Sequence, residues 1–206
     1  MSRPGKIVCV GRNYLEHAKE LGNEVPKEPL LFLKPPSSVI GMNDAIVLPA
    51  QSAQVEFEGE IGVRIGQKIY RASEDEARAA ITGICAVNDV TARDLQKTDG
   101  QWTRAKGFDT FCPVGPAATP PDDLDSLTVV TRVNGVERQR GVAADMAFHI
   151  PTLLAYITTI MTLEPGDLVA TGTPAGVGRL LPGDVVEVEV VGFSTISNVV
   201  SALTLI

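Results

Sequence analysis

Three glutamates alternate with apolar or small residues in the segment Val55-Glu56-Phe57-Glu58-Gly59-Glu60-Ile61. This period-two alternation continues to residue 65 and predicts a β-strand that carries its carboxylates on one face. Side chains two apart on a strand stand about 7 Å from each other, so three carboxylates in a row need solvent, basic partners or a cation. One interpretation is a half-exposed strand with a solvated acidic face. The other is a site for a hard metal ion, in which Glu58 and Glu60 supply oxygen ligands.

A third oxygen ligand would have to come from another segment, and Asp89 is the candidate. It follows the apolar run 84–87, and a carboxylate at the end of a buried strand needs a reason to be there. The alternative is that Asp89 caps a short helix expected over 91–97. An all-oxygen set suits Mg²⁺ or Mn²⁺ better than zinc. His17 and His149 are far apart and form neither an HxH nor an HExxH pattern, so zinc-hydrolase motifs are absent from the sequence.

Two further groups have the residue types of catalytic side chains. His17 and Glu20 lie three apart on a helix expected over 14–21, so they can meet, either as a surface ion pair or as a histidine oriented by a carboxylate. Lys106 is flanked by an alanine and a glycine, small residues that allow close approach to a ligand. The alternative for Lys106 is an ordinary surface lysine.

Candidate substrate-binding residues lie in three places. Arg93 and Gln96 are three apart and share one face of the expected helix over 91–97, which is alternatively just a solvated face. Thr173 lies in a turn rich in glycine and proline, where its hydroxyl either meets a substrate carboxylate or serves the turn itself. Arg12 precedes the histidine pair and is a further candidate for substrate contact.

Composition limits what kind of protein can hold these residues. The chain has 206 residues, 44% of them hydrophobic and 21% charged, with a formal net charge of −7. These values indicate one globular domain over 1–206 and exclude extensive disorder. The negative charge without basic clusters argues against nucleic-acid binding, and there is no apolar run of about 18 residues that would span a membrane. Three widely spaced cysteines and an N-terminus unlike a signal peptide favour the reducing cytoplasm.

The expected elements are short. About eight to ten strands stand against three or four helices, which predicts a mainly β or α+β domain rather than an alternating βαβ one. Local signals include a capping box at Ser73 and Glu76, an Asn134-Gly135 hairpin turn, and a helix opened by Pro151. The polar, proline-punctuated segment 14–29 is the expected mobile lid.

Taken together, five segments resemble the fumarylacetoacetate hydrolase family. The resemblance extends from Ile7 to the C-terminus, is closest to the short acylpyruvase and oxaloacetate decarboxylase branch, and rests on the order and spacing of the segments. They are Gly11-Arg12-Asn13-Tyr14, Phe57-Glu58-Gly59-Glu60, Asn88-Asp89-Val90-Thr91-Ala92-Arg93-Asp94, Ala105-Lys106-Gly107-Phe108-Asp109-Thr110 and Thr171-Gly172-Thr173-Pro174-Ala175-Gly176-Val177-Gly178.

The resemblance implies a mixed β-sandwich roll, a homodimer, and one Mg²⁺ or Mn²⁺ per subunit held by Glu58, Glu60 and Asp89. It implies that His17 and Glu20 are an acid–base dyad on a lid and that Lys106 contacts the carbonyl or enolate of the substrate. Many acylpyruvase relatives carry two histidines where this chain has Glu56 and Phe57, which leaves the substrate open.

The function expected from these residues is hydrolysis of the carbon–carbon bond of an acylpyruvate-type 2,4-dioxo acid, with possible decarboxylation of oxaloacetate. One alternative is isomerisation, hydration or decarboxylation of unsaturated 2-oxo acids in aromatic catabolism. An alternative from another class is a non-catalytic protein that binds 2-oxo acids. In each case the expected partner is a small 2-oxo acid, with neither nucleic acid nor membrane.

Overall fold

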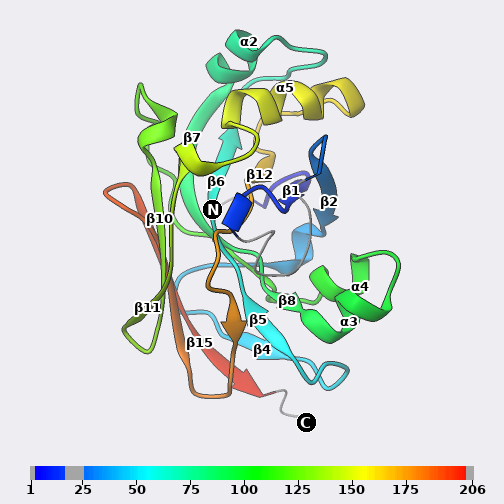
Figure 1. Cartoon of the computed structure of the whole chain (residues 1–206), viewed down its shortest axis with the longest axis vertical. Coiled ribbons are helices and arrows are strands. Elements are labelled where there is room, and N and C mark those ends of the chain that lie inside the picture. Colours follow the sequence, from blue (N-terminus) through cyan, green and yellow to red (C-terminus); the bar gives the residue numbers. More distant parts are fainter. Residues whose placement is uncertain (1–2, 17–25, 203–206) are drawn as a thin grey trace.

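Two five-stranded sheets form the body of the molecule (Figure 1). The computed structural model describes residues 3–16 and 26–202. The first sheet has the order β2 (Leu30–Lys34), β1 (Ile7–Gly11), β12 (Leu168–Ala170), β6 (Gly59–Ile65) and β7 (Ile81–Asn88). The second has the order β11 (Val136–Val142), β10 (Thr128–Val133), β14 (Val185–Val190), β15 (Ser194–Ala202) and β4 (Ile46–Leu48).

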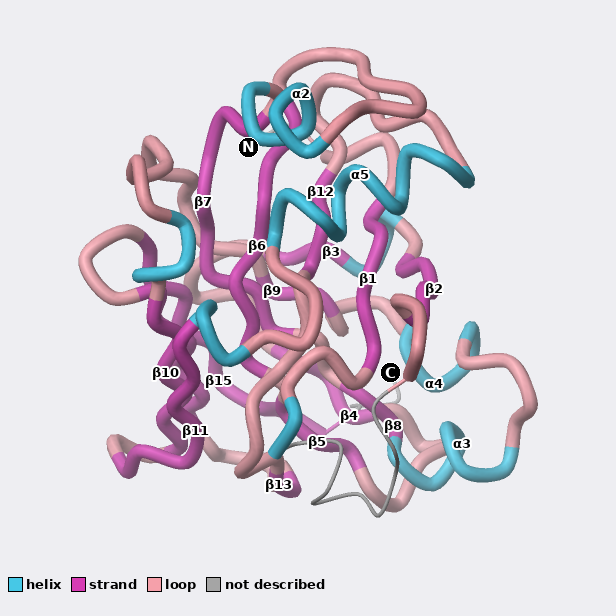
Figure 2. Tube along the Cα trace, turned by 45° about the horizontal axis from the view of Figure 1, so that its top comes forward, coloured by secondary structure: helices cyan, strands magenta, loops and turns pink. Residues whose placement is uncertain are grey.

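Smaller elements complete the fold. A three-stranded sheet has the order β13 (Gly178–Arg179), β5 (Val55–Phe57) and β8 (Thr91–Ala92), and β3 (Val39–Ile40) pairs with β9 (Cys112–Pro113). The α-helices are α2 (Glu74–Ala79), α3 (Arg93–Thr98), α4 (Thr103–Lys106) and α5 (Ile150–Ile160). Single turns of 3₁₀-helix are η1 (Pro36–Ser38), η2 (Leu124–Ser126) and η3 (Ala143–Asp145). Figures 1 and 2 show α2 beside α5 at one end of the molecule, and α3 beside α4 at its side.

The strand pairing is mixed. β1 runs parallel to β12, β4 to β15 and β3 to β9, whereas the other strand pairs are antiparallel. Strands β6 and β7 pack against β10, β14 and β15, and apolar side chains of both sheets fill the space between them, for example Ile61, Ile84, Val188 and Ile196. These side chains follow the period-two alternation of each strand, so their opposite neighbours face away from this core. The mainly β, mixed sandwich expected from the sequence is confirmed.

The short-range signals fold as expected. Ser73 and Glu76 form both hydrogen bonds of a capping box at the start of α2. Asn134 and Gly135 both have positive φ in the turn between β10 and β11. Proline lies in the first turn of α5, where its missing N–H is not needed. Fifteen strands are present in the described part of the chain, more than the eight to ten expected, because several are only two residues long.

The acidic segment differs from the expectation in one respect. Residues 55–65 do not form one continuous strand, since β5 and β6 are separated at Glu58. The backbone N–H of Glu58 donates to the side-chain oxygen of Asn88 at 3.0 Å instead of to a neighbouring strand. This break directs β5 and β6 into different sheets, and the candidate site lies at the junction.

The cysteines and the membrane-spanning potential of the helices were the other features predicted from the sequence. Cys9, Cys85 and Cys112 are free and buried, in agreement with core packing. None of the helices in residues 3–16 and 26–202 is long and apolar enough to cross a membrane.

Candidate metal centre and its pocket

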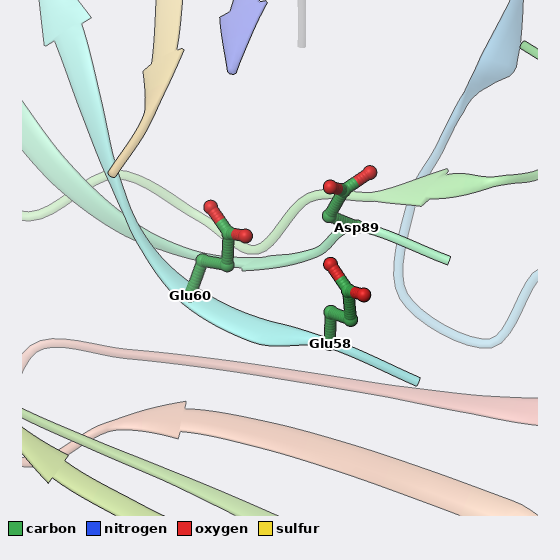
Figure 3. A group of neighbouring side chains, drawn as sticks. All are labelled: Glu58, Glu60 and Asp89. Carbon is green, nitrogen blue, oxygen red and sulfur yellow. The ribbon is translucent and has the colours of Figure 1, made fainter. Parts of the chain in front are cut away.

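Three buried carboxylates converge at the junction between β5, β6 and β7 (Figure 3). Glu58 lies between β5 and β6, Glu60 lies on β6, and Asp89 directly follows β7. Each offers an oxygen within 4.8 Å of the others, and their exposed fractions are 5%, 1% and 1%. The solvated acidic face considered for this segment is therefore wrong.

Strand pairing explains how the third carboxylate reaches the other two. β6 and β7 are antiparallel, with Gly59 opposite Asn88. The next residue, Asp89, donates its backbone N–H to the Glu58 carbonyl oxygen at 2.8 Å. Asp89 does not cap a helix, because α3 begins only at Arg93 and its N-cap is Ala92.

A backbone hydrogen bond holds the carboxylate of Glu60. Its Oε2 accepts from the N–H of Gly172 at 2.8 Å. Gly172 has a φ of +104°, a conformation that side-chain-bearing residues rarely adopt, so glycine allows this approach. Burial, followed by the nearby charges of Asp89 and Glu58, raises the pKa of the Glu60 carboxyl well above its usual value. A positive charge beside Glu60 would remove that penalty.

Two buried lysines hold Asp89 from both sides. Lys106 Nζ donates to Asp89 Oδ2 at 2.5 Å and to Glu58 Oε2 at 2.8 Å, and Lys34 Nζ donates to Asp89 Oδ1 at 2.7 Å. Burial lowers the pKa of Lys106, but the attraction of Asp89 and Glu58 outweighs it and raises this pKa above the usual lysine value. The alternative of Lys106 as a surface lysine is wrong, since it is 2% exposed.

Arg93 links the remaining acidic residues of the segment. Its guanidinium donates to Glu56 Oε2 at 2.7 Å, to Glu58 and to Gln96. Arg93 and Gln96 thus meet on one face of α3, as their spacing predicts. The face is not simply solvated, because Arg93 is 3% exposed. Arg93 thus holds one carboxylate oxygen of Glu58, while Lys106 holds the other.

The donor set fits a hard divalent cation. Glu58, Glu60 and Asp89 offer only oxygen, which Mg²⁺ and Mn²⁺ prefer over the nitrogen and sulfur favoured by zinc. Burial and the neighbouring carboxylates both raise the pKa of Glu60, so a cation bound beside it would stabilise its ionised form. The buried acidic triad can therefore bind a metal.

A cavity of about 270 Å³ opens onto these carboxylates. Glu58 and Glu60 form part of its wall, whereas Asp89 is not among the residues that line it. The aromatic rings of Phe32 and Trp102, packed edge to face at 5.2 Å, form an apolar part of the wall. Its other polar lining residues are Arg12, Arg93, Gln96, Lys97, Lys106 and Thr173. This volume suits a small organic acid.

All described candidate substrate residues therefore line one cavity. Thr173 does so with its hydroxyl already engaged: it donates to the Gly59 carbonyl at 2.9 Å and accepts from Gln139 at 2.7 Å. Arg12 has a φ of +59°, an uncommon conformation for a residue with a side chain, in a turn that Asn13 ties to the carbonyls of Thr171 and Phe148. Their contacts with a substrate remain predictions.

The catalytic dyad cannot be placed in the same way. His17 and Glu20 lie outside the described residues, as does most of the expected lid over 14–29. Their roles remain predictions from the sequence.

Sequence reasoning missed several residues of the site, among them Lys34, Phe32, Lys97 and Trp102. Lys34 and Phe32 occur in an extended, proline-flanked stretch without a motif, and Trp102 lies between two short helices. The single tryptophan of a chain with few aromatic residues was the one available signal, since a large aromatic side chain in a polar segment often serves binding.

The sequence of this chain is similar to one known protein family and to several known proteins. The model of the fumarylacetoacetate (FAA) hydrolase C-terminal family matches residues 6–201. The 2,4-didehydro-3-deoxy-L-rhamnonate hydrolase of a Sphingomonas species is 43% identical over 90% of this chain and 70% of its own. The human mitochondrial oxaloacetate tautomerase FAHD2A is 42% identical over 96% of this chain and 67% of its own.

A solved structure of similar fold is also known. The fumarylpyruvate hydrolase of Pseudomonas aeruginosa, determined in complex with Mn²⁺ and pyruvate, has a TM-score of 0.90 and 28% sequence identity. The match covers 96% of this chain and 90% of that protein.

Proposed function

Because this chain belongs to the fumarylacetoacetate hydrolase family, we propose that it is a metal-dependent enzyme that stabilises the enolate of a small 2-oxo acid. The reaction we propose first is hydrolysis of the carbon–carbon bond of an acylpyruvate-type 2,4-dioxo acid. The observation that carries the proposal is the buried carboxylate triad, of which Glu58 and Glu60 form part of the wall of a cavity lined by cations. The name of the Sphingomonas relative supports it, since that substrate is dehydrogenated at carbons 2 and 4, the carbonyl positions of a 2,4-dioxo acid.

Glu58, Glu60 and Asp89 would hold Mg²⁺ or Mn²⁺. When bound there, the ion supplies Lewis acidity toward the 2-oxo carboxylate group and its developing enolate. Lys106 has three N–H donors, of which two go to Glu58 and Asp89, and it lines the cavity, where its ammonium group lies over the Phe32 ring. Its positive charge adds to the stabilisation of negative charge on the enolate oxygen.

The remaining residues would position the substrate and move protons. Arg12, Gln96 and Thr173 line the cavity and are the proposed contacts of the substrate, and Arg93 fixes Glu58 and Gln96. His17, oriented by Glu20, would take a proton from the water that attacks C4. The C3–C4 bond then breaks, giving a carboxylic acid and the enolate of pyruvate, which takes a proton at C3.

A second reaction is favoured by a specific finding. The 42% identity with an oxaloacetate tautomerase supports interconversion of the keto and enol forms of oxaloacetate at the same site. This reaction shares the enolate but needs no attacking water. Decarboxylation of oxaloacetate, which also leaves the enolate of pyruvate, belongs to the same group.

A substrate panel with Mg²⁺ tests the proposal. Acylpyruvates, fumarylpyruvate, oxaloacetate and unsaturated 2-oxo acids are incubated with the protein while pyruvate release and enol absorbance are followed. We expect pyruvate and a second carboxylic acid from an acylpyruvate. Enol–keto exchange of oxaloacetate without pyruvate would assign the tautomerase reaction instead. Absence of any turnover would contradict both and leave a 2-oxo acid binding protein.

The oligomeric state and the cellular compartment are proposed separately from the chemistry. We propose that the protein acts as a homodimer in the cytoplasm, where it meets its 2-oxo acid. Sedimentation equilibrium would test the dimer directly.

A further inference from the structure

We propose that Lys34 sets the charge of the metal centre, weakening the binding of the cation and strengthening the binding of the 2-oxo acid anion, although it lines no part of the cavity. The inference rests on the proposed function for the identity of these two ligands.

The position of Lys34 points to an electrostatic role. It is the last residue of β2, and its side chain is completely buried. Its ammonium group donates to Asp89 Oδ1 at 2.7 Å and to the Val90 carbonyl at 3.1 Å. Lys106, by contrast, lines the cavity and holds the other oxygen of Asp89. Among the described residues, Lys34 therefore contacts the carboxylate triad through Asp89, and its charge acts on the rest of the site across space.

Burying an ammonium group costs desolvation free energy that packing alone does not require. Removing its charge from water is costly, and an apolar side chain of similar length would pack in the same volume without that penalty. The thiols of Cys9 and Cys112 feel the charge of Lys34 as well. Burial raises the pKa of both, that of Cys112 to about 12, so both thiols remain neutral. The charge of Lys34 is thus directed at Asp89 and its neighbours.

The effect of Lys34 on ligand binding follows from the sum of the charges around the site. Among the described residues, four buried acidic groups and three buried cations surround the site, so this set carries one net negative charge when every carboxyl is ionised, as a bound cation favours for Glu60. With a divalent cation bound, this buried set carries one net positive charge, which, together with Arg12 and Lys97 of the cavity wall, attracts a monoanionic 2-oxo acid. The groups are Glu56, Glu58, Glu60 and Asp89 on one side, and Lys34, Arg93 and Lys106 on the other.

Removing the charge of Lys34 shifts every step of this series. The metal ion would meet a site with one positive charge fewer and bind more tightly. The loaded site would then be less positive by one charge, so the anion would bind more weakly. Because the groups are buried, solvent screens these interactions little, and an effect of about tenfold on each affinity is expected. A lysine that merely supports the fold would not move the two affinities in opposite directions.

The test uses two neutral variants and a matched control. Lys34→Met and Lys34→Gln both remove the charge. Lys6→Met is the control, because Lys6 also pairs with a buried aspartate, Asp167, away from this site. Calorimetry measures Mn²⁺ binding to the metal-free protein, and then pyruvate binding to the Mn²⁺-saturated protein.

We expect both Lys34 variants to bind Mn²⁺ about tenfold more tightly and pyruvate about tenfold more weakly than the wild type, with Lys6→Met unchanged. The inference is overturned if the two affinities fail to move in opposite directions, or if both neutral variants do not fold even with Mn²⁺ present. Failure of the loaded wild type to bind pyruvate would count against the proposed function instead. In that case the Mn²⁺ measurement alone decides on Lys34: tighter binding supports its role, and unchanged or weaker binding excludes it.

Discussion

Replacing Asp89 or Glu58 by the corresponding amide removes a charged oxygen ligand and changes the size of the side chain little. We predict that Asp89→Asn or Glu58→Gln lowers Mn²⁺ affinity by at least about 100-fold and removes nearly all activity, because a charged ligand is lost from a buried site. Glu164→Gln is the control, since Glu164 is a half-exposed acid that pairs with Lys68 away from the site. Calorimetry with Mn²⁺ decides. Unchanged binding in both variants would exclude these residues as ligands.

Substitution of His17 tests whether the metal ion and the general base have separate roles in the reaction. His17→Ala should lose about 10²- to 10⁴-fold in acylpyruvate hydrolysis, the usual contribution of a positioned general base, while keeping metal binding. Glu20→Ala should lose less, because it removes orientation rather than the proton acceptor. Oxaloacetate decarboxylation needs no attacking water and should suffer less in His17→Ala. Equal losses on both substrates would show that His17 only shapes the pocket.

Single residues were predictable where chemistry and order along the chain agree. Glu58, Glu60 and Asp89 were foreseen as a cluster, and the structure brings them within 4.8 Å. Lys34 was not foreseen, because it reaches Asp89 across 55 residues and no spacing rule connects a strand end to a distant carboxylate. The pairing of Arg93 with Gln96 followed from helix spacing, but its hold on Glu58 required the tertiary structure.

Among the elements, β6 depends on a close approach at Gly59. A Cβ at this position would overlap the hydroxyl oxygen of Thr131 on β10 and come within 3.2 Å of Val188 on β14. Gly59→Ala should destabilise the protein by about 1–3 kcal/mol, as overpacking usually does, and weaken Mn²⁺ binding because the glycine separates two ligands. Denaturant unfolding and calorimetry measure these two effects.

Thr131 supplies the control for this clash. Its hydroxyl is buried without a hydrogen-bond partner among the described residues, so Thr131→Ala alone should change stability little. Gly59→Ala combined with Thr131→Ala should recover part of the lost stability. Purely additive losses in the double variant would contradict the packing explanation.

Elements set by neighbouring residues were predictable, and those set by distant ones were not. The capping box, the Asn134-Gly135 turn and the proline-initiated helix follow local rules and folded as expected. The acidic stretch over 55–65 kept its alternation but not its continuity. The break at Glu58 coincides with its hydrogen bonds to Asn88, the last residue of β7, and to Asp89, which follows it.

For the whole molecule, metal removal and pH should be coupled through Glu60. Its raised pKa means that the metal-free folded protein holds this proton more tightly than the unfolded chain does. Stability of the metal-free protein therefore falls as pH rises from the usual glutamate pKa toward the raised value. A bound cation removes this penalty, so the Tm increase caused by Mn²⁺ should be larger at about pH 8 than at about pH 5. Thermal unfolding with Mn²⁺ and with a chelator measures it, and a pH-independent increase would contradict this coupling.

The fold class was predictable from composition and element length, whereas the sheet order was not. Many short strands and tight turns indicate a mainly β domain. The pairing of β1 with β12 joins residues about 160 positions apart, such as Ile7 and Leu168, and only the folded chain reveals it. This long-range pairing places Arg12 and Thr173, which follow these two strands, on the same cavity.

The most direct test of the central claim is the position of the metal. Crystals grown with Mn²⁺ and oxalate, a stable mimic of the 2-oxo acid group, would be measured at a wavelength where manganese scatters anomalously. We predict one strong anomalous peak per chain between the carboxylates of Glu58, Glu60 and Asp89, with oxalate on the side of the cavity. A peak elsewhere, or none at saturating Mn²⁺, would contradict the account.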